Sequence, residues 1–149
     1  MIRVYLKAVG LAAPGLDGWR EAAPVLGGVR RYEAGELSRY TPALLPANER
    51  RRTTPTIRLA LRVAEEAMQD SGVPPEQVAT VFASSEGDAG IADKMCHTLT
   101  LPGRPVSPTV FHNSVHNAAA GYWAIATGSR QASTSIACGE GTFAAGLIE

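Results

Sequence analysis

Apolar and polar residues alternate at the start of the chain, with apolar side chains at every second position from Ile2 to Leu6. A period of two is typical of a β-strand with one buried face. We therefore expect the chain to open with a strand over residues 2–7. Residues 14–52 keep neither a strand period nor a helix period for long, and they predict loops with a short helix near Trp19.

The next segment has the spacing of an amphipathic helix. Apolar residues recur every three or four positions from Ile57 to Met68, with charged and polar residues between them. Thr54 can cap a helix and Pro55 suits its first turn, whereas Gly72 is a typical stop. This pattern predicts a helix from Thr54 to Gly72.

A β-prone run, VATVFASS, follows that helix after two prolines and predicts a strand of a length that suits burial. A helix followed by such a strand favours an α/β layer fold. The polar and glycine-containing residues 84–90 come next, where loops of α/β sheets commonly line sites, although a plain turn is an equal interpretation. Residues 117–128 are small and apolar with a closing glycine, and they predict a tightly packed helix.

The last eighteen residues carry the candidate chemistry. They predict a short strand over Ser133–Ala137, then Cys138, a glycine-rich bend and a helix over Thr142–Ile148. A thiol at a helix N-terminus feels the partial positive charge of unpaired N–H groups, which favours the thiolate and lowers its pKa. The same N–H groups can stabilise an oxyanion. The alternative is that Cys138 packs in the core, as free cysteines often do.

Composition narrows the function classes. The chain has 149 residues, with 14 basic and 14 acidic side chains and no net charge, which suits one domain and argues against general nucleic-acid binding. No run approaches the roughly 20 apolar residues of a membrane helix, and the apolar stretch at the start of the chain is too short for a secretion signal. We therefore expect a cytoplasmic protein that uses neither membrane nor nucleic acid, with Cys96 and Cys138 as thiols. Nothing in the sequence predicts a cofactor.

The histidines do not predict a metal site. His112 and His116 are four residues apart and could share a helix face, and His97 follows Cys96 directly. No carboxylate spacing completes a metal-binding motif with them. We expect no bound metal.

Taken together, the motifs resemble the β-ketoacyl synthases, the condensing enzymes of the thiolase superfamily. The segment IACGEGTFA, from Ile136 to Ala144, resembles the TACASGTHA of their nucleophile. Upstream, Asn117, Ala120 and Gly121 lie in register with the family's NxxAG stretch. The family's "eALxdAGl" helix is similar to the helix here that ends in QDSGV. The strand and loop that follow it in the family are similar to the run VATVFASSEGDAG.

The resemblance implies a thiolase-like α/β fold, with α/β/α layers and a mixed sheet. Because the family's fold is duplicated, residues 1–149 are expected to form its N-terminal half, either as a fragment of a longer protein or as a subunit that works in a complex. The implied activity is transfer of an acyl group from an acyl carrier protein to Cys138, followed by Claisen condensation with a malonyl unit. The family also needs two histidines after the cysteine, and none follows residue 138. The alternative is a non-catalytic subunit, like the chain-length factors of bacterial aryl-polyene pathways, that pairs with a complete ketosynthase.

The resemblance also implies site residues and partners. Cys138 is the catalytic candidate, and the substrate-binding candidates are Phe111, Asn117, Gly139 and Thr142. The aromatic residues Phe111, Tyr122 and Trp123 are possible pocket elements, and packing in the core is the favoured alternative for them. The strand over residues 133–137 implies a homodimer, or a heterodimer with a complete ketosynthase. Charge alone, and not the resemblance, makes Arg39 and Arg50–Arg52 candidates to contact the acidic carrier protein. For the cluster Arg50–Arg52, a solvated loop before the helix is the favoured interpretation.

Overall fold

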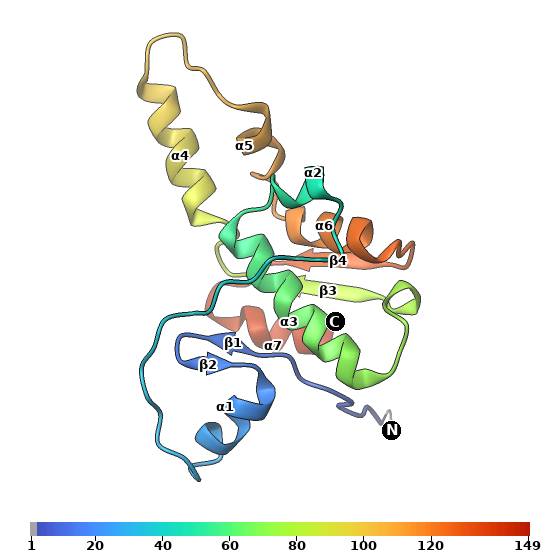
Figure 1. Cartoon of the computed structure of the whole chain (residues 1–149). Helices are drawn as coiled ribbons and strands as arrows, with labels where there is room; N and C mark the ends of the chain where they lie inside the picture. Colours follow the sequence, from blue (N-terminus) through green and yellow to red (C-terminus); the bar gives the residue numbers. More distant parts are fainter. Residues whose placement is uncertain (1–2) are drawn as a thin grey trace.

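The computed structural model of the chain describes residues 3–149, which fold into helices and two small two-stranded sheets (Figure 1). An antiparallel pair joins β1 (Ala12–Ala13) to β2 (Leu16–Asp17), and a parallel pair joins β3 (Thr80–Ala83) to β4 (Ser133–Ile136). The helices are α1 (Trp19–Leu26), α2 (Ala47–Arg50), α3 (Pro55–Ser71), α4 (Ala89–Thr100), α5 (Pro108–His112), α6 (Ala118–Thr127) and α7 (Thr142–Ile148), with short 3-10 turns at Pro75–Gln77 and Gly139–Gly141. Among these residues, no helix combines the length and apolar character that crossing a membrane would need.

The long helix α3 confirms the sequence prediction at both ends. The Thr54 side chain accepts a hydrogen bond from the backbone N–H of Ile57 at 3.2 Å, and Pro55 occupies the first turn. Gly72 ends the helix with a φ of 67°, a left-handed conformation that glycine adopts without a steric penalty. The predicted short helix near Trp19 and the helix over residues 117–128 are also present, as α1 and α6.

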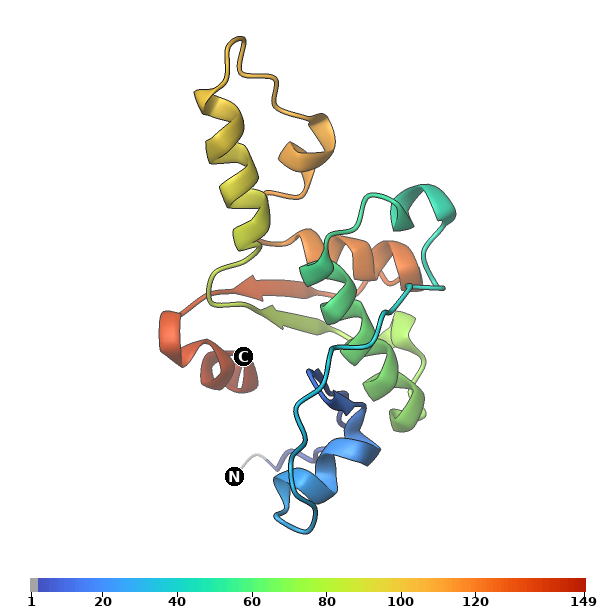
Figure 2. The same cartoon turned by 60° about the vertical axis from the view of Figure 1, so that its left-hand side comes forward.

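The parallel pair β3–β4 lies between helices. In both Figure 1 and Figure 2, α6 lies on one side of the pair and α7 on the other. Neighbouring residues of β3 accordingly face opposite ways: Phe82 packs against the hydrophobic core, whereas a Cβ added to Gly146 of α7 would lie 2.8 Å from the Cβ of Ala83. Helices on both sides of a parallel pair confirm the α/β class. β3 is shorter than predicted and only half-buried.

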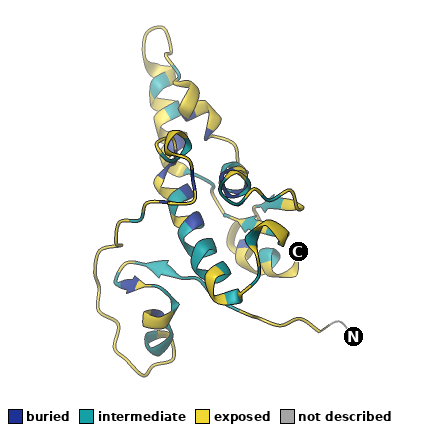
Figure 3. Ribbon diagram, turned by 45° about the vertical axis from the view of Figure 1, so that its right-hand side comes forward, coloured by how far each residue is buried: buried dark blue, intermediate teal, exposed yellow. Residues whose placement is uncertain are grey.

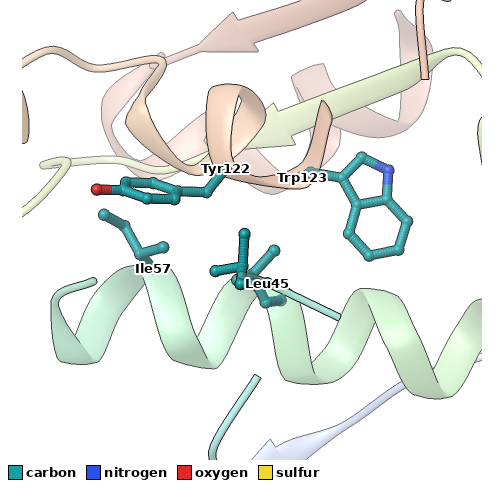
Figure 4. Close-up of a cluster of buried hydrophobic side chains, with 5 residues drawn as sticks. Leu45, Ile57, Tyr122 and Trp123 are labelled. Carbon is teal, nitrogen blue, oxygen red and sulfur yellow. The ribbon is translucent and has the colours of Figure 1, made fainter. Parts of the chain in front are cut away.

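The hydrophobic core lies between α3 and α6 (Figure 4). Its buried members are Leu45, Ile57, Leu61, Tyr122 and Trp123, of which Leu61 is fully buried. Tyr122 and Trp123 therefore confirm the prediction that they pack in the core. Burial also raises the pKa of Tyr122.

Glu66 on α3 holds the N-terminal hairpin through two backbone groups. Its Oε2 accepts a hydrogen bond from the N–H of Leu11 at 2.8 Å, and its Oε1 accepts one from the N–H of Trp19 at 2.6 Å. The chain also comes very close to α3 at Gly10, where a Cβ would lie 1.9 Å from the carbonyl oxygen of Val63. Glycine is thus required for the hairpin to sit at this distance.

The predicted strand at the start of the chain is wrong. Residues 3–10 form no strand, and the predicted part of this segment, residues 3–7, is exposed (Figure 3); Ile2 lies outside the described residues. The exposed fractions are 88% for Val4, 81% for Tyr5 and 82% for Leu6. Alternation marks side chains that suit a pleated, half-buried surface, but a strand forms only when its backbone finds a partner. No strand partner pairs with this segment among residues 3–149.

Asp17 at the end of β2 links three segments. Its carboxylate forms an ion pair with Arg62 of α3 and accepts a hydrogen bond from the Ser38 hydroxyl at 2.7 Å. Arg62 also donates to the carbonyl of Ser38 at 3.1 Å, so the long connection between α1 and α2 is tied to both other segments. The Ser38 hydroxyl, and then the Arg62 guanidinium, lower the pKa of Asp17.

Replacing Glu66 should destabilise the fold. In Glu66→Ala, the N–H groups of Leu11 and Trp19 lose their acceptor, and we expect a loss of about 2 kcal/mol in the free energy of unfolding. Urea denaturation followed by circular dichroism measures it. Glu36→Ala is the matched control, because Glu36 is exposed and has no side-chain hydrogen bond within residues 3–149. Equal stability of the two variants would contradict the role of Glu66.

The lowered pKa of Asp17 makes part of the stability dependent on pH. A carboxyl whose pKa is lower in the folded state stabilises the fold above its unfolded pKa of about 3.9, and this contribution disappears as the pH falls through the folded value. Asp17→Asn should therefore be less stable than wild type at pH 6, with a difference that shrinks below about pH 4. Urea denaturation at both pH values measures it, with the exposed Asp70→Asn as control. A difference that stays constant with pH would count against the assignment.

Candidate functional site

The parallel pairing of β3 and β4 brings two loops together at the carboxyl ends of the strands. The register pairs Thr80 with Ser133 and Ala83 with Ile136. One further bond, from the N–H of Ser84 to the carbonyl of Ile136 at 3.1 Å, extends the pairing past β3. The loop over residues 84–88 and the turn at Cys138 are therefore neighbours, as expected for strands whose C-termini share one sheet edge.

Cys138 occupies a tight turn between β4 and α7. Gly139 follows it with a φ of 54°, a conformation that favours glycine. The N–H of Gly141 donates to the carbonyl of Cys138 at 3.1 Å and closes a 3-10 turn before the helix begins. Cys138 is exposed, which is contrary to the interpretation that it packs in the core. The predicted order of strand, thiol, bend and helix is confirmed.

Thr142, the first residue of α7, stabilises this turn with two hydrogen bonds. The side chain is buried, with 4% of the residue exposed, and its hydroxyl donates to the carbonyl of Gly139 at 2.7 Å. The same oxygen accepts a hydrogen bond from the N–H of Cys138 at 2.9 Å. The sequence predicted free N–H groups at this helix start for an oxyanion, but the N–H of Cys138 already has an acceptor within the chain. An incoming oxyanion would have to compete with Thr142 for that donor.

Ser85 reaches the turn from the opposite loop. Its hydroxyl donates to the carbonyl of Gly139 at 3.0 Å, across 54 positions of sequence. Gly139 therefore accepts hydrogen bonds from two hydroxyls, one local and one distant. The sequence predicted a candidate site in the loop over residues 84–90. It could not single out Ser85, because the contact of Ser85 with Gly139 depends on the register of β3 against β4.

Two of the three histidines, His112 and His116, make contacts within the chain, whereas the His97 side chain is exposed. The Nε2 of His116 lies 3.0 Å from the carbonyl oxygen of Ser84, which joins the connection between α5 and α6 to the loop after β3. The His112 ring meets the Tyr122 ring edge-on, with centroids 6.1 Å apart and an interplanar angle of 87°. His112 ends α5 and His116 lies beyond it, so the two share no helix face. Within residues 3–149, no three His, Cys, Asp or Glu side chains gather as a metal site would require.

Two of the four substrate-binding candidates lie on the Cys138 turn and two lie on other elements. Gly139 and Thr142 lie on the turn itself, whereas Phe111 lies on α5 and Asn117 precedes α6, both exposed. No hydrogen bond within residues 3–149 joins either one to the turn. With 65% of the residue exposed, Phe111 is not a core residue, so the alternative of core packing is wrong for it.

Asn113 is a buried residue that the sequence analysis missed. It is 3% exposed, and its Nδ2 donates to the carbonyl of Arg52 at 2.7 Å, which ties the end of α5 to the segment after α2. A polar residue inside an otherwise unremarkable segment carries no pattern that marks it as buried. Its contact is long-range, so the sequence offered no signal for it.

Comparison with known proteins identifies the family. The model for the beta-ketoacyl synthase N-terminal domain matches residues 29–149. The chain belongs to the beta-ketoacyl synthase family. This match confirms the resemblance seen in the sequence and includes every predicted site residue, from Phe111 to Thr142.

A solved structure confirms that the β-ketoacyl synthase family match extends to the fold. The chain is similar to a chain in the structure of a ketosynthase (ApeO) in complex with its chain length factor (ApeC) from Xenorhabdus doucetiae, with a TM-score of 0.76 and 24% sequence identity. The likeness covers 99% of the present chain and 60% of the other, so this chain spans about three fifths of its neighbour's length. No curated protein matches the sequence.

Proposed function

We propose that Cys138 is an acyl-accepting nucleophile of the β-ketoacyl synthase type. The observation that carries the proposal is an exposed thiol two residues after the end of β4, on a turn held by Thr142 and Ser85. In the proposed step, the Cys138 thiolate attacks the carbonyl of an acyl thioester and a new C–S bond forms. The carrier's thiolate leaves and takes up the proton that the Cys138 thiol gave up.

The condensation step needs groups beyond those near Cys138. Charge on the enolate of the decarboxylated malonyl unit must be stabilised, and the family uses two histidines for this purpose. The His112 ring packs edge-on against Tyr122 and His116 contacts the backbone of Ser84, and within residues 3–149 no hydrogen bond brings either ring to the Cys138 turn. We propose that the Claisen step depends on residues from a longer chain or from a partner subunit.

A second function, that of a non-catalytic chain-length-factor-like subunit, is favoured by one observation. The N–H of Cys138 is bonded to the Thr142 hydroxyl rather than left open for an oxyanion. The solved neighbour is a complex of a ketosynthase with its chain length factor, and a subunit of that kind would shape the acyl tunnel of its partner. Here Cys138 would not be acylated.

Both functions imply a partner subunit. β4 pairs with β3 along one edge and has no second strand neighbour among residues 3–149. A strand edge of this kind can pair with a second chain. We propose a homodimer, or a heterodimer with a complete ketosynthase, that uses the edge of β4. Such a complex fits a cytoplasmic protein of fatty-acid or aryl-polyene biosynthesis.

The acyl carrier protein is the second proposed partner. Three exposed arginines, Arg39, Arg51 and Arg52, are available to an acidic surface, and one of them, Arg52, pairs with Glu49 at 3.4 Å. Arg50 is less available, because its guanidinium donates to the carbonyl of Leu45 at 2.9 Å. Charge complementarity of this kind mainly speeds encounter.

Acylation of Cys138 is tested by intact-protein mass after incubation with an acyl-loaded carrier protein. Wild type should gain one acyl group, and Cys138→Ala should gain none. Cys96→Ala is the matched control, because Cys96 is the other exposed thiol of the described chain and should not be required. Each protein is measured alone and together with a complete ketosynthase.

The outcomes separate the two functions. An adduct on wild type and Cys96→Ala that is absent from Cys138→Ala supports the nucleophile. An adduct on neither protein, with stable co-purification of the ketosynthase, rejects the nucleophile and supports the chain-length-factor-like subunit. An adduct that persists in Cys138→Ala rejects the assignment of the acylated thiol.

A further inference from the structure

The Cys138 turn receives a single long-range side-chain hydrogen bond among the described residues, and it comes from Ser85. The two bonds of Thr142 are local, since this residue lies four positions after Cys138 and belongs to the turn's own helix. They fix the shape of the turn but not its place relative to the rest of the molecule. The bond from the Ser85 hydroxyl to the Gly139 carbonyl, at 3.0 Å, attaches the turn to the loop after β3.

That loop is itself held at several points, so it can act as a support. The N–H of Ser84 donates to the Ile136 carbonyl at 3.1 Å, directly beside Ser85. The Ser84 hydroxyl accepts a hydrogen bond from the N–H of Gly87 at 3.0 Å, and the Ser84 carbonyl lies 3.0 Å from the Nε2 of His116. Ser84, the residue before Ser85, is therefore fixed by both the sheet and the α5–α6 connection, and the backbone after Ser85 is bonded back to the Ser84 side chain.

We propose that Ser85 is a positioning residue for Cys138, and that its hydroxyl holds the nucleophile turn in register with the carboxyl end of β3. The role rests on the proposed acylation of Cys138. Gly139 is the residue directly after the thiol, so a shift of the Gly139 backbone also displaces Cys138. Small displacements of a nucleophile reduce the rate of attack, because the reacting atoms must approach in a narrow geometry.

The chain offers a matched control in Ser133. Its hydroxyl also makes one exposed cross-strand hydrogen bond, with Thr80 at 2.8 Å, but at the opposite end of the same strand pair. Ser133→Ala thus removes a comparable bond without touching the turn. Ser85→Thr keeps a hydroxyl at position 85 and tests whether the hydroxyl, rather than the serine as such, is required.

The first measurement is hydrogen–deuterium exchange of the full chain, read over residues 137–143. It needs no acyl substrate, so it is independent of the proposed function. Ser85→Ala should exchange at least threefold faster than wild type in this segment, while residues 133–136 keep their protection. Ser133→Ala should leave residues 137–143 unchanged, and Ser85→Thr should remain within twofold of wild type.

The second measurement is the rate of acyl-adduct formation on Cys138, with an octanoyl thioester of N-acetylcysteamine as the probe. Ser85→Ala should be about three- to tenfold slower than wild type, as expected for the loss of one hydrogen bond, and Ser85→Thr should recover the rate. Wild type without an adduct would reject the proposed function, and the exchange data would still decide whether Ser85 holds the turn. Exchange or acylation in Ser85→Ala that equals that of Ser133→Ala would overturn the positioning role.

Discussion

The parallel pairing of β3 with β4 is the constraint on which the candidate site depends. Four residues of each strand are in register, and the pairing continues to Ser84. Because parallel strands end at the same edge, this short ladder places the loop after β3 beside the turn after β4. The contact between Ser85 and Gly139, across 54 sequence positions, is a direct consequence of that register. A slip of one residue would turn every side chain of β4 to the other face and would offset the two loops by about 3.3 Å, more than the reach of one hydrogen bond.

Helix α3 positions the segments that lie outside the strand pair. Its inner face packs against α6 through Ile57 and Leu61, which supports the strand pair from one side. Its outer residues hold the N-terminal segments, through the carboxylate of Glu66 and the guanidinium of Arg62. One face of the helix thus packs in the hydrophobic core, and the other forms hydrogen bonds and an ion pair with the N-terminal segments. These polar interactions position segments that bury little apolar surface.

The sequence predicted those features that depend on local pattern. Thr54 and Gly72 mark the ends of α3 because a side-chain cap and a left-handed glycine are local chemistry. The strand, thiol and bend around Cys138 were predicted for the same reason. The prediction of a strand over residues 2–7 was wrong. Alternation of apolar and polar residues shows that a segment is suited to a sheet, but not that a partner strand is present. The roles of Ser85 and Asn113 could not be predicted from the sequence either, because both depend on contacts between segments far apart in the chain.

The register of β3 against β4 is tested most directly by cross-linking. In a background with Cys96→Ser and Cys138→Ser, the pair Thr80→Cys and Ser133→Cys places two thiols where the two hydroxyls now share a hydrogen bond of 2.8 Å. Disulfides form only between closely spaced Cβ atoms, so mild oxidation should close this pair rapidly, with the loss of two hydrogens by mass. The shifted pair of Thr80→Cys with Ser135→Cys should stay reduced, because Ser135 lies opposite Phe82. Closure of the shifted pair in preference to the aligned one would contradict the register, and with it the shared edge at which Ser85 meets the Cys138 turn.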